Sequence, residues 1–460
     1  MPVRIFDTMA RDKVELTQRD PGRLSMYVCG PTVYDVPHIG HGRTAVVFDT
    51  IRRYLEWRGF DVTFVTNVTD VEDKIIRRAA ETGASEPEVA ARFETAYFDE
   101  MARLGVRKAD RLPHATEYIG PMQELIAELV ATGHAYTVEG DNGGVYYDVA
   151  TFPSYGALPH RSMDQLLDSA GARVEVDEAK RNPVDFALWK AAKPGEPAWD
   201  SPWGRGRPGW HIECSAMSLD LLGEGFDLHG GGDDLVFPHH ENERAQAEGA
   251  GHRFARHWIH SAMVQVGGEK MSKSSGNFTT LAEALDAHGP RAFRMAVLQT
   301  HYRRAMELGD TELAAAARTI DRLDALFRRA AVAGVGWTGA PPDGATVDRF
   351  RSEMDDDFAT PTALAAVFDA VGSANAAIDG GALDRAASLV ATVAELIGVL
   401  GLEADTGLDE RDAEIDALVA ARDAARATRD FAEADRIRDE LAGHGVILED
   451  TPGGTIWRRP

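Results

Sequence analysis

Cysteine is scarce in this chain: two of the 460 residues are cysteine, at positions 29 and 214. This scarcity excludes the small secreted proteins that depend on a framework of disulfide bonds. Residues 1–11 also lack the basic and apolar pattern of an export signal. We therefore expect a cytoplasmic protein with reduced thiols, and the two cysteines need an explanation other than a disulfide bond.

Long apolar runs are missing as well. No segment approaches the roughly 20 apolar residues of a membrane-spanning helix, so we expect no membrane partner. No internal repeat is visible, which excludes a solenoid. With 460 residues, the chain is long enough for about three domains.

Positive charge is in deficit. Lys and Arg number 49 against 74 Asp and Glu, and the formal net charge is −25. This balance argues against indiscriminate binding to nucleic acids, whose phosphates repel an acidic protein. An acidic protein can still carry local positive surface, for which the candidates are Arg181, Arg205–Arg207 and Arg303–Arg304.

A strand, a helix and a second strand are expected near the start of the chain. Residues 24–28 alternate as in a strand buried on one face, residues 40–54 carry apolar side chains at helical spacing, and residues 62–68 are again strand-like. Two strands joined by a helix form a parallel pair, whose ligand crevice lies at the carboxyl ends of the strands.

Two segments are candidates for binding nucleotide phosphates. The first is His38-Ile39-Gly40-His41, which lies where the helix should begin, so that free N–H groups and the helix dipole favour an anion. Gly40 leaves room for a flat base against the backbone. The second, about 230 residues later, contains Lys270 and Lys273 on an expected loop. Their ammonium groups could follow the charge that moves onto a leaving pyrophosphate.

The two cysteines fall at informative places in the sequence. Cys29 ends the first expected strand, and Cys214 precedes a segment rich in His, Asp and Glu at 227–243. Two thiolates, an imidazole and a carboxylate would form a reasonable zinc shell.

The histidine of this shell is left open by the spacing. Pro238 favours the start of a helix, on which His239 and Glu243 are four residues apart and share a face. His240 lies three residues before Glu243 and could also face the metal.

The same motifs occur together in one known family. The chain resembles the bacterial cysteinyl-tRNA synthetases, which are class I aminoacyl-tRNA synthetases, essentially from end to end. The stretches that carry the resemblance are Tyr27–Asp35, His38–His41, Asn67–Asp70, Lys180–Pro183, Gly209–Ser215, His229–Asp234, Pro238–Glu243 and Lys270–Ser274. The resemblance implies an α/β fold, a Rossmann-like parallel sheet with a connective insertion, followed by an α-helical bundle and a small α+β anticodon-binding domain.

Together, the resemblance and the periodicity predict six segments. In chain order they are the first half of the Rossmann catalytic domain (1–80), the connective insertion (81–207), the second half of the Rossmann domain (208–255), the lysine loop with the stem-contact region (256–310), the helical bundle (311–405) and the anticodon-binding domain (406–460). Within the last segment we expect one helix over 415–442 and short strands at 446–448 and 455–457.

The resemblance also implies roles for individual residues. It implies zinc ligation by Cys29, Cys214, His239 and Glu243, and so selects His239 over His240. The implied catalytic contacts to ATP, which carries Mg²⁺, come from His38, His41, Lys270 and Lys273. Further contacts to the nucleotide are implied for Gly40, Thr32, Asp234 and Lys273, and contacts to cysteine for Gly30, Thr69, Trp210 and His229. Trp210 could equally be a core aromatic residue.

The implied reaction has two steps. The carboxylate of L-cysteine attacks the α-phosphorus of ATP to give cysteinyl-adenylate and pyrophosphate, and a monomeric enzyme then transfers the acyl group to tRNA(Cys). An ordinary pocket would separate cysteine from serine by only a few kcal/mol, whereas zinc binds a thiolate far better than a neutral alcohol. Because four protein ligands would close the shell, either zinc becomes five-coordinate with substrate or Glu243 loosens.

Two other functions fit parts of the pattern. The cysteine ligases of mycothiol biosynthesis resemble these synthetases but lack the anticodon module, whose candidate base contacts here are Arg426, Phe431, Asp435 and Asp450. An Arg- and Asp-rich helix can also be only a solvated face. A non-catalytic, tRNA-binding paralogue should have lost the histidines and lysines of the ATP site, which this chain retains. We therefore expect a cysteinyl-tRNA synthetase.

Overall fold

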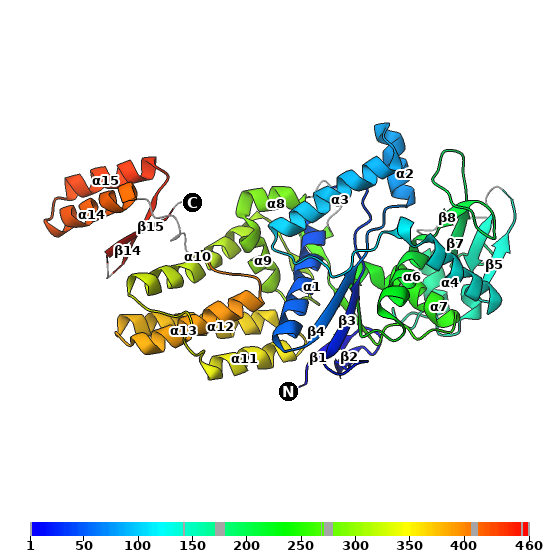
Figure 1. The fold of residues 1–460 in the computed structure, drawn as a ribbon, viewed down its shortest axis with the longest axis horizontal. Coiled ribbons are helices and arrows are strands. Elements are labelled where there is room, and N and C mark those ends of the chain that lie inside the picture. Colours follow the sequence, from blue (N-terminus) through cyan, green and yellow to red (C-terminus); the bar gives the residue numbers. More distant parts are fainter. Residues whose placement is uncertain are drawn as a thin grey trace.

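The computed structural model describes residues 2–140, 143–170, 180–267, 269–270, 279–405, 413–451 and 454–458. The molecule is elongated (Figure 1). A parallel sheet lies near its middle, an antiparallel sheet with its helices lies at one end, and a small helical module lies at the other end.

The central sheet has the order β10-β9-β3-β4, and all its strands are parallel. Its strands are β3 (Arg23–Val28), β4 (Asp61–Thr66), β9 (Leu228–Gly232) and β10 (His257–Ser261). From β3 the chain first adds β4 on one side and later β9 on the other side. The crevice at such a switch point is where open α/β sheets bind ligands.

Strand β3 is buried on both faces, not on one face as its alternation predicted. Met26 packs with helix α1 (Ile39–Trp57), whereas Tyr27 packs with helix α6 (Trp210–Leu222) on the other face. Parallel strands covered by helices on both sides are expected to be buried in this way. Helix α7 (Glu241–Gly249) packs beside α6.

The segment between β4 and α6 forms most of one end of the molecule. Its sheet is antiparallel with the order β5-β6-β7-β8, formed by Ala135–Val138, Gly144–Tyr147, Phe186–Ala191 and Gly206–Pro208. Its helices are α2 (Asp73–Thr82), α3 (Glu86–Arg103), α4 (Ile119–Ala131) and α5 (Met163–Ala170). In Figure 1, α3 lies beside α1 and not with the antiparallel sheet.

Short elements complete the catalytic half. They are the hairpin β1 (Arg4–Asp7) and β2 (Asp12–Glu15), the sheet β12-β11-β13 (Glu269–Lys270, Val264–Val266, Met306–Glu307), helices α8 (Leu281–His288) and α9 (Pro290–Leu298), and the helical turns Ala115–Glu117, Val149–Thr151, Asp233–Leu235 and Val236–His240.

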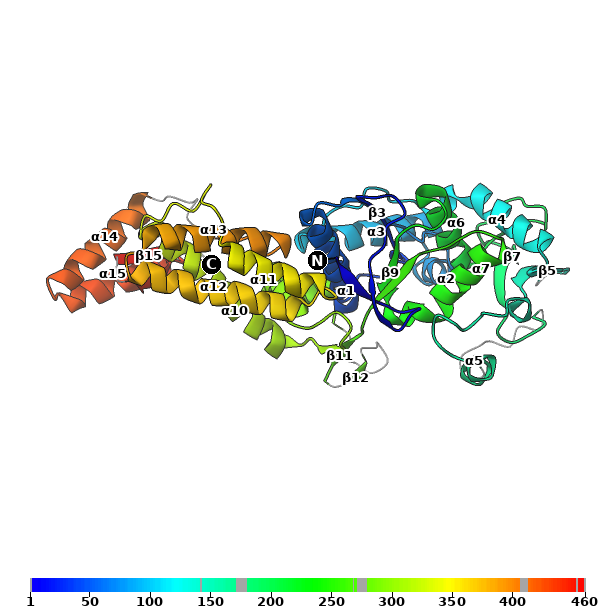
Figure 2. The same ribbon diagram turned by 90° about the horizontal axis from the view of Figure 1, so that it is seen from below.

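A bundle of long helices follows, as Figure 2 shows from a second side. Its helices are α10 (Asp310–Val332), α11 (Gly344–Asp355), α12 (Thr360–Asp379) and α13 (Leu383–Val399). By length and composition α12 could span a membrane, which the sequence analysis did not expect. In the structure it packs against α11 and α13 through Leu364, Val367 and Val371, and this packing accounts for its apolar composition.

The expected helix over 415–442 is in fact two helices. Helix α14 (Ala413–Ala427) and helix α15 (Phe431–Gly443) pack on each other. Arg429 turns the chain at a positive φ of 62°, and the Asp430 side chain caps α15 by accepting the N–H of Glu433. The two expected strands form the hairpin β14 (Ile447–Thr451) and β15 (Gly454–Arg458).

Arg207 is buried in an ion-pair network and does not form basic surface, contrary to one expectation from the sequence. Its side chain is 4% exposed and pairs with Asp73 and Glu196, while Lys190 lies 2.6 Å from Asp73. Burial raises the pKa of Asp73, but the charges of Lys190 and Arg207 outweigh it and lower that pKa to about 2. The network fastens the antiparallel sheet to α2.

Replacing Asp73 should therefore loosen this end of the molecule. We expect Asp73→Asn to lower the free energy of unfolding by about 1–2 kcal/mol, because the buried Arg207 guanidinium loses one of its two charged partners while solvent screens the partly exposed Asp73. Since the folded pKa lies below the unfolded one, the same contribution fades as the pH falls from 3.8 to about 2. Urea denaturation at neutral pH measures the change.

The control for this experiment is Asp61→Asn. Asp61 pairs with Arg23 at 3.7 Å, and both side chains are 76% exposed. An exposed pair of this kind contributes less than about 1 kcal/mol. Equal effects of the two substitutions would contradict a structural role for the buried network.

Candidate functional site

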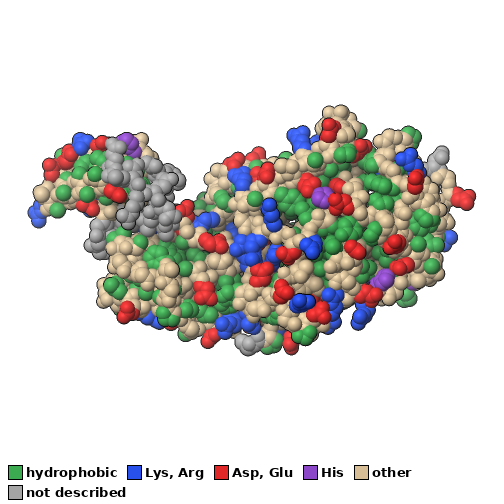
Figure 3. Space-filling model, viewed as in Figure 1, with side chains coloured by type: hydrophobic (Ala, Val, Ile, Leu, Met, Phe, Trp, Pro, Cys, Tyr) green, Lys and Arg blue, Asp and Glu red, His purple; other side chains and the backbone are tan. Residues whose placement is uncertain are grey.

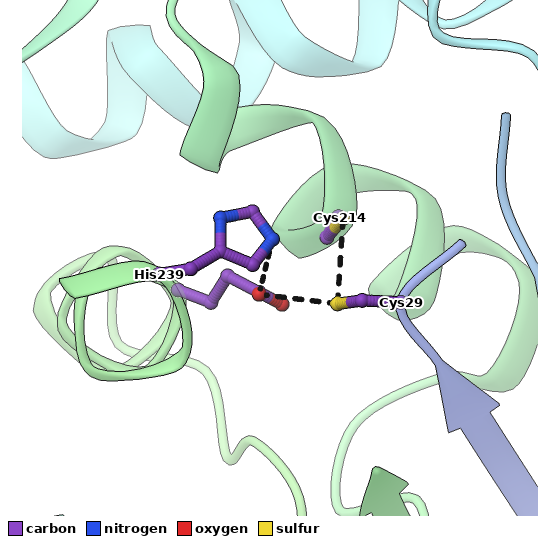
Figure 4. A group of neighbouring side chains, drawn as sticks. Cys29, Cys214 and His239 are labelled. Atoms are coloured by element: carbon purple, nitrogen blue, oxygen red, sulfur yellow. Dashed lines mark hydrogen bonds and ion pairs between the residues drawn. The ribbon is translucent and has the colours of Figure 1, made fainter. Parts of the chain in front are cut away.

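Four side chains converge at the carboxyl end of β3. Cys29 follows β3, Cys214 lies on α6, His239 lies in the turn before α7, and Glu243 lies on α7. Figure 4 shows that Cys29, Cys214 and His239 point toward one another from these separate elements. The sequence places Cys29 far from the other three, and the order of the parallel strands brings them together.

The spacing of these side chains suits a bound cation. The Sγ atoms of Cys29 and Cys214 are 3.7 Å apart, and Glu243 Oε1 lies 3.5 Å from Cys29 Sγ and 3.0 Å from His239 Nε2. One ligand atom from each of the four residues lies within 4.8 Å of the others. The structure therefore brings together all four residues of the expected metal shell.

A second set of ligands overlaps the first. It consists of Cys29, His229, His240 and Glu243, each of which also has a ligand atom within 4.8 Å of the others. His240 Nε2 lies 3.3 Å from Cys29 Sγ, and His229 Nε2 lies 2.8 Å from Glu243 Oε2. The ambiguity between His239 and His240 thus persists in the structure. The set with His239 contains both thiols, which a thiophilic metal prefers.

Neighbouring histidines orient the two candidate imidazoles. His211 Nδ1 lies 2.8 Å from His239 Nδ1, and His260 Nε2 lies 2.8 Å from His240 Nδ1. Burial lowers the pKa of His211 and of His260 to about 3, so both rings are neutral at physiological pH. Metal-binding histidines are commonly oriented by such a partner on the other ring nitrogen. His211 had no predicted role, although it lies three residues before Cys214 on one helix face.

Burial makes the anionic forms of the ligands unfavourable without a cation. It raises the pKa of the Cys29 thiol, the Cys214 thiol and the Glu243 carboxyl group. Two thiolates and a carboxylate at these distances would also repel one another. A divalent cation would reverse both effects, and the donor atoms are those of a metal site.

The expected phosphate-binding segment caps helix α1. The N–H of Gly40 donates to His38 Nδ1 at 3.1 Å, and the N–H of His38 donates to His41 Nδ1 at 3.2 Å. The two rings stack with their centroids 3.8 Å apart. A neutral imidazole whose Nδ1 accepts a hydrogen bond carries its proton on Nε2. Both rings are thus set as Nε2–H donors at a helix amino terminus, which suits an anion.

Only part of the lysine segment can be located. Lys270 is in β12, which pairs with β11, and its side chain is not described. Lys273 lies outside the described residues.

The residues expected around the amino acid lie near the metal shell. Gly30 follows Cys29, and a Cβ added there would be 1.7 Å from the carbonyl oxygen of Asn67, so no side chain fits. Thr69 donates to Glu213 Oε2 at 2.8 Å. Trp210 is partly exposed and stacks on His239 at 4.1 Å, which places it at the site and not in a hydrophobic core. His229 stacks on Trp258 at 4.7 Å.

The remaining nucleotide candidates lie at the same edge of the sheet. Thr32 forms an isolated parallel bridge with Thr69, and Gly40 is in the first turn of α1. Asp234 follows β9 and is exposed.

The candidate anticodon contacts lie in the terminal module. Phe431 begins α15 and is 63% exposed. The polar candidates pair within the module: Arg426 lies 2.7 Å from Asp450, and Asp435 lies 3.0 Å from Arg438. The Arg422 and Arg426 guanidinium groups outweigh burial and lower the pKa of Asp450. Of the four candidates, Phe431 is the one that presents a large apolar surface to solvent.

Three family models match consecutive parts of the chain. Residues 15–318 match the catalytic domain of tRNA synthetases class I (C). Residues 349–404 match the DALR domain, and residues 408–458 match the cysteinyl-tRNA ligase anticodon binding domain.

Full-length relatives agree with these matches. The chain is 50% identical over 466 residues to a cysteine–tRNA ligase of Halorhodospira halophila, with 99% of each chain covered. It is 47% identical over 472 residues to a cysteine–tRNA ligase of Symbiobacterium thermophilum, with 100% of each chain covered.

Solved structures show the same fold at low identity. A methionyl-tRNA synthetase of Mycobacterium tuberculosis in complex with methionyl-adenylate aligns with a TM-score of 0.60 at 19% identity and covers 83% of this chain and 90% of that chain. A leucyl-tRNA synthetase complex of Agrobacterium radiobacter aligns with a TM-score of 0.60 at 11% identity and covers 85% and 84%. These alignments support the class I synthetase fold.

His41 should remain neutral in the protein without nucleotide. Burial and the adjacent His38 ring lower its pKa from 6.5 to about 3. Because the unfolded chain binds the proton first, His41 reduces stability as the pH falls through that range. Deuterium exchange at the imidazole C2 position, followed by mass spectrometry, reports the pKa of each histidine.

His252 serves as the comparison in the same experiment. Burial lowers its pKa, but hydrogen bonds with Glu128 and Glu224 outweigh this effect and raise it. We expect His252 to titrate above 6.5 and His41 to show no midpoint between pH 5 and 8. A midpoint for His41 near 6.5 would refute the burial argument.

Proposed function

The chain belongs to the cysteine–tRNA ligase family and is an ATP-dependent enzyme of that activity, and from this premise we propose that Cys29, Cys214, His239 and Glu243 hold one zinc ion that selects the amino acid. The match of residues 408–458 to an anticodon-binding domain favours tRNA over the amino sugar of the mycothiol cysteine ligases.

The observation that carries the proposal is the spacing of the two sulfur atoms. Two sulfurs bound to one tetrahedral zinc at about 2.3 Å lie about 3.8 Å apart. The Sγ atoms of Cys29 and Cys214 are 3.7 Å apart in the structure. His239 and Glu243 complete an S₂NO donor set of the kind that zinc accepts.

Zinc bound there would accept the substrate sulfur as a thiolate, a form that serine cannot match. The protein's own residues then hold the rest of the amino acid. We propose that Trp210 covers it from the side of His239, that Thr69 and His229 line the pocket, and that the backbone of Gly30 contacts it beside Cys29. In support of this, Trp210 stacks on His239, His229 contacts Glu243, Gly30 follows Cys29, and Thr69 donates to Glu213, which precedes Cys214.

The same proposal assigns the nucleotide to the amino terminus of α1. His38 and His41 donate Nε2–H groups to the phosphates, and Gly40 allows the base to approach the backbone. Thr32 and Asp234 contact the nucleotide from the neighbouring strand ends. Lys270 and Lys273, with Mg²⁺, neutralise the charge on the leaving pyrophosphate, a contact that accelerates the reaction because it strengthens in the transition state.

Cys214→Ser tests the role of zinc. We expect the variant to lose most of its bound zinc and its cysteine-dependent exchange of pyrophosphate into ATP, because an alcohol is a poor zinc ligand. ATP binding should stay within about twofold, since α1 is not altered. Elemental analysis measures the bound zinc, the exchange assay measures activation of cysteine, and isothermal titration measures the binding of ATP.

Treating the unaltered enzyme with a chelator should reproduce the loss, and added zinc should reverse it. Serine should not replace cysteine in the unaltered enzyme. Full zinc content and normal cysteine activation in Cys214→Ser would remove the metal from the proposal.

We propose that the terminal module reads the anticodon of tRNA(Cys) through Phe431. Its ring is 63% exposed at the start of α15, whereas the nearby charged candidates form ion pairs within the module. An exposed aromatic ring that begins a helix is suited to stacking on an unpaired base.

Phe431→Ala should weaken tRNA use without altering activation of cysteine. Since stacking on a base contributes about 1–3 kcal/mol, we expect KM for tRNA to rise about tenfold, with exchange of pyrophosphate unchanged. Phe431→Trp should retain the wild-type KM. The control is Ile447→Ala, because Ile447 is also an exposed hydrophobic residue of the module, at 38%. Equal effects of the two alanine variants would contradict the stacking role.

We further propose that the enzyme acts in the cytoplasm as a monomer. The chain has two cysteines and both are proposed zinc ligands, a use of cysteine that fits a reducing compartment. The large hydrophobic side chains that are exposed among the described residues lie on separate elements, and scattered residues of this kind do not mark a subunit interface.

A further inference from the structure

A chain of hydrogen bonds connects the two cysteines through residues that have no assigned task in metal binding. The N–H of Gly30, next to Cys29, donates to Asn67 Oδ1 at 2.9 Å. Asn67 Nδ2 donates to Thr69 Oγ1 at 3.2 Å, and Thr69 Oγ1 donates to Glu213 Oε2 at 2.8 Å. Glu213 precedes Cys214 on α6. This series of hydrogen bonds therefore begins beside Cys29 and ends beside Cys214.

The direction of every bond in this chain is fixed. A backbone N–H can only donate, so the Asn67 atom that faces Gly30 must be the amide oxygen, and the NH₂ group must face Thr69. The Thr69 hydroxyl accepts from that NH₂ group and directs its own hydrogen at Glu213. Glu213 Oε2 accepts this hydrogen whether or not Oε1 carries a proton, so the arrangement does not depend on the protonation state.

Asn67 also contacts the second cysteine directly. Its Oδ1 lies 3.7 Å from Cys214 Sγ, a distance at which a thiol can donate a hydrogen bond. One amide oxygen thus fixes the backbone that follows Cys29 and faces the sulfur of Cys214. Asn67 follows β4, so this contact joins three elements that are distant in sequence.

The side chains in this series of hydrogen bonds are buried, and burying them lowers the stability of the fold. Asn67 and Thr69 are each 1% exposed and Glu213 is 0% exposed, and Glu213 Oε1 has no hydrogen-bond partner among the described residues. A buried carboxyl oxygen without a partner destabilises a fold. A residue that lowers stability in this way needs a reason other than folding, and such groups concentrate at functional sites.

We propose that Asn67, Thr69 and Glu213 are positioning residues that hold the sulfurs of Cys29 and Cys214 at the separation required by the metal. This inference rests on the proposed zinc site. Residues that orient metal ligands typically affect metal affinity by 10- to 100-fold when replaced.

The test measures zinc affinity in the absence of substrates, by competition with a chromogenic chelator. We expect Glu213→Leu to bind zinc about 10- to 100-fold more weakly, because the Thr69 hydroxyl loses its acceptor. Glu213→Gln keeps an oxygen acceptor of the same shape and should stay within about threefold of the wild type.

Stability separates positioning from a merely structural role. Glu213→Leu removes the unpartnered Oε1 but also leaves the Thr69 hydroxyl without its acceptor, so the two effects on stability oppose each other and the unfolding midpoint of the zinc-free protein should change little. A structural residue would instead lower it. The expected signature of Glu213→Leu is therefore weaker zinc binding without loss of zinc-free stability.

A double-mutant cycle tests whether Glu213 acts through Thr69. Thr69→Val removes the hydroxyl at nearly constant shape, and the double variant should bind zinc no more weakly than the weaker single variant. The matched control is Ser218→Ala, because Ser218 is also fully buried on α6 but donates to the carbonyl of Ser215, outside the chain. Its zinc affinity should equal that of the wild type.

The outcomes distinguish two failures. If the wild type binds no zinc, the proposed function fails, and the inference fails with it. If the wild type binds zinc and both Glu213→Leu and Thr69→Val bind it within twofold of the wild type, only the positioning role is overturned. Additive losses in the double variant would also overturn it.

Discussion

The mutual repulsion of buried anionic donors is the constraint on which the rest of this structure depends. Two thiols and a carboxyl group meet in a pocket where their deprotonated forms are unfavourable, and a cation would make those forms favourable. The donors come from a strand end, from one helix and from the start of another helix. The sheet order β10-β9-β3-β4 supplies this meeting point, because it places the end of β3 next to the end of β9.

Much of the fold followed from local patterns in the sequence. The periodicity of residues 24–28, 40–54 and 62–68 predicted the strand, helix and strand that the structure contains as β3, α1 and β4. It did not show that β3 is buried on both faces, because the second face is covered by α6, a helix about 180 residues later. The turn between α14 and α15 was also missed, although Asp430 is a typical helix-capping residue.

The site was predictable in its members but not in its arrangement. Helical spacing allowed either His239 or His240 to face Glu243, and the structure keeps both within reach, so the choice comes from the family resemblance and from the donor chemistry. The hydrogen bond between Thr69 and Glu213 joins residues 144 positions apart, and no local pattern encodes it. Arg207 looked like surface charge in the sequence, since composition does not reveal ion pairing inside a fold. On the face drawn in Figure 3, acidic and basic side chains are interspersed.

The position of the terminal module has a consequence for substrate choice. Figure 1 places α14 and α15 at the opposite end of the molecule from the antiparallel sheet, with the helical bundle between the module and the catalytic crevice. A nucleic acid that engages both regions at once must be long enough to reach along the bundle. The length of the nucleic acid thereby contributes to substrate choice. A short RNA fragment with the correct bases would not contact the terminal module and the catalytic crevice at the same time.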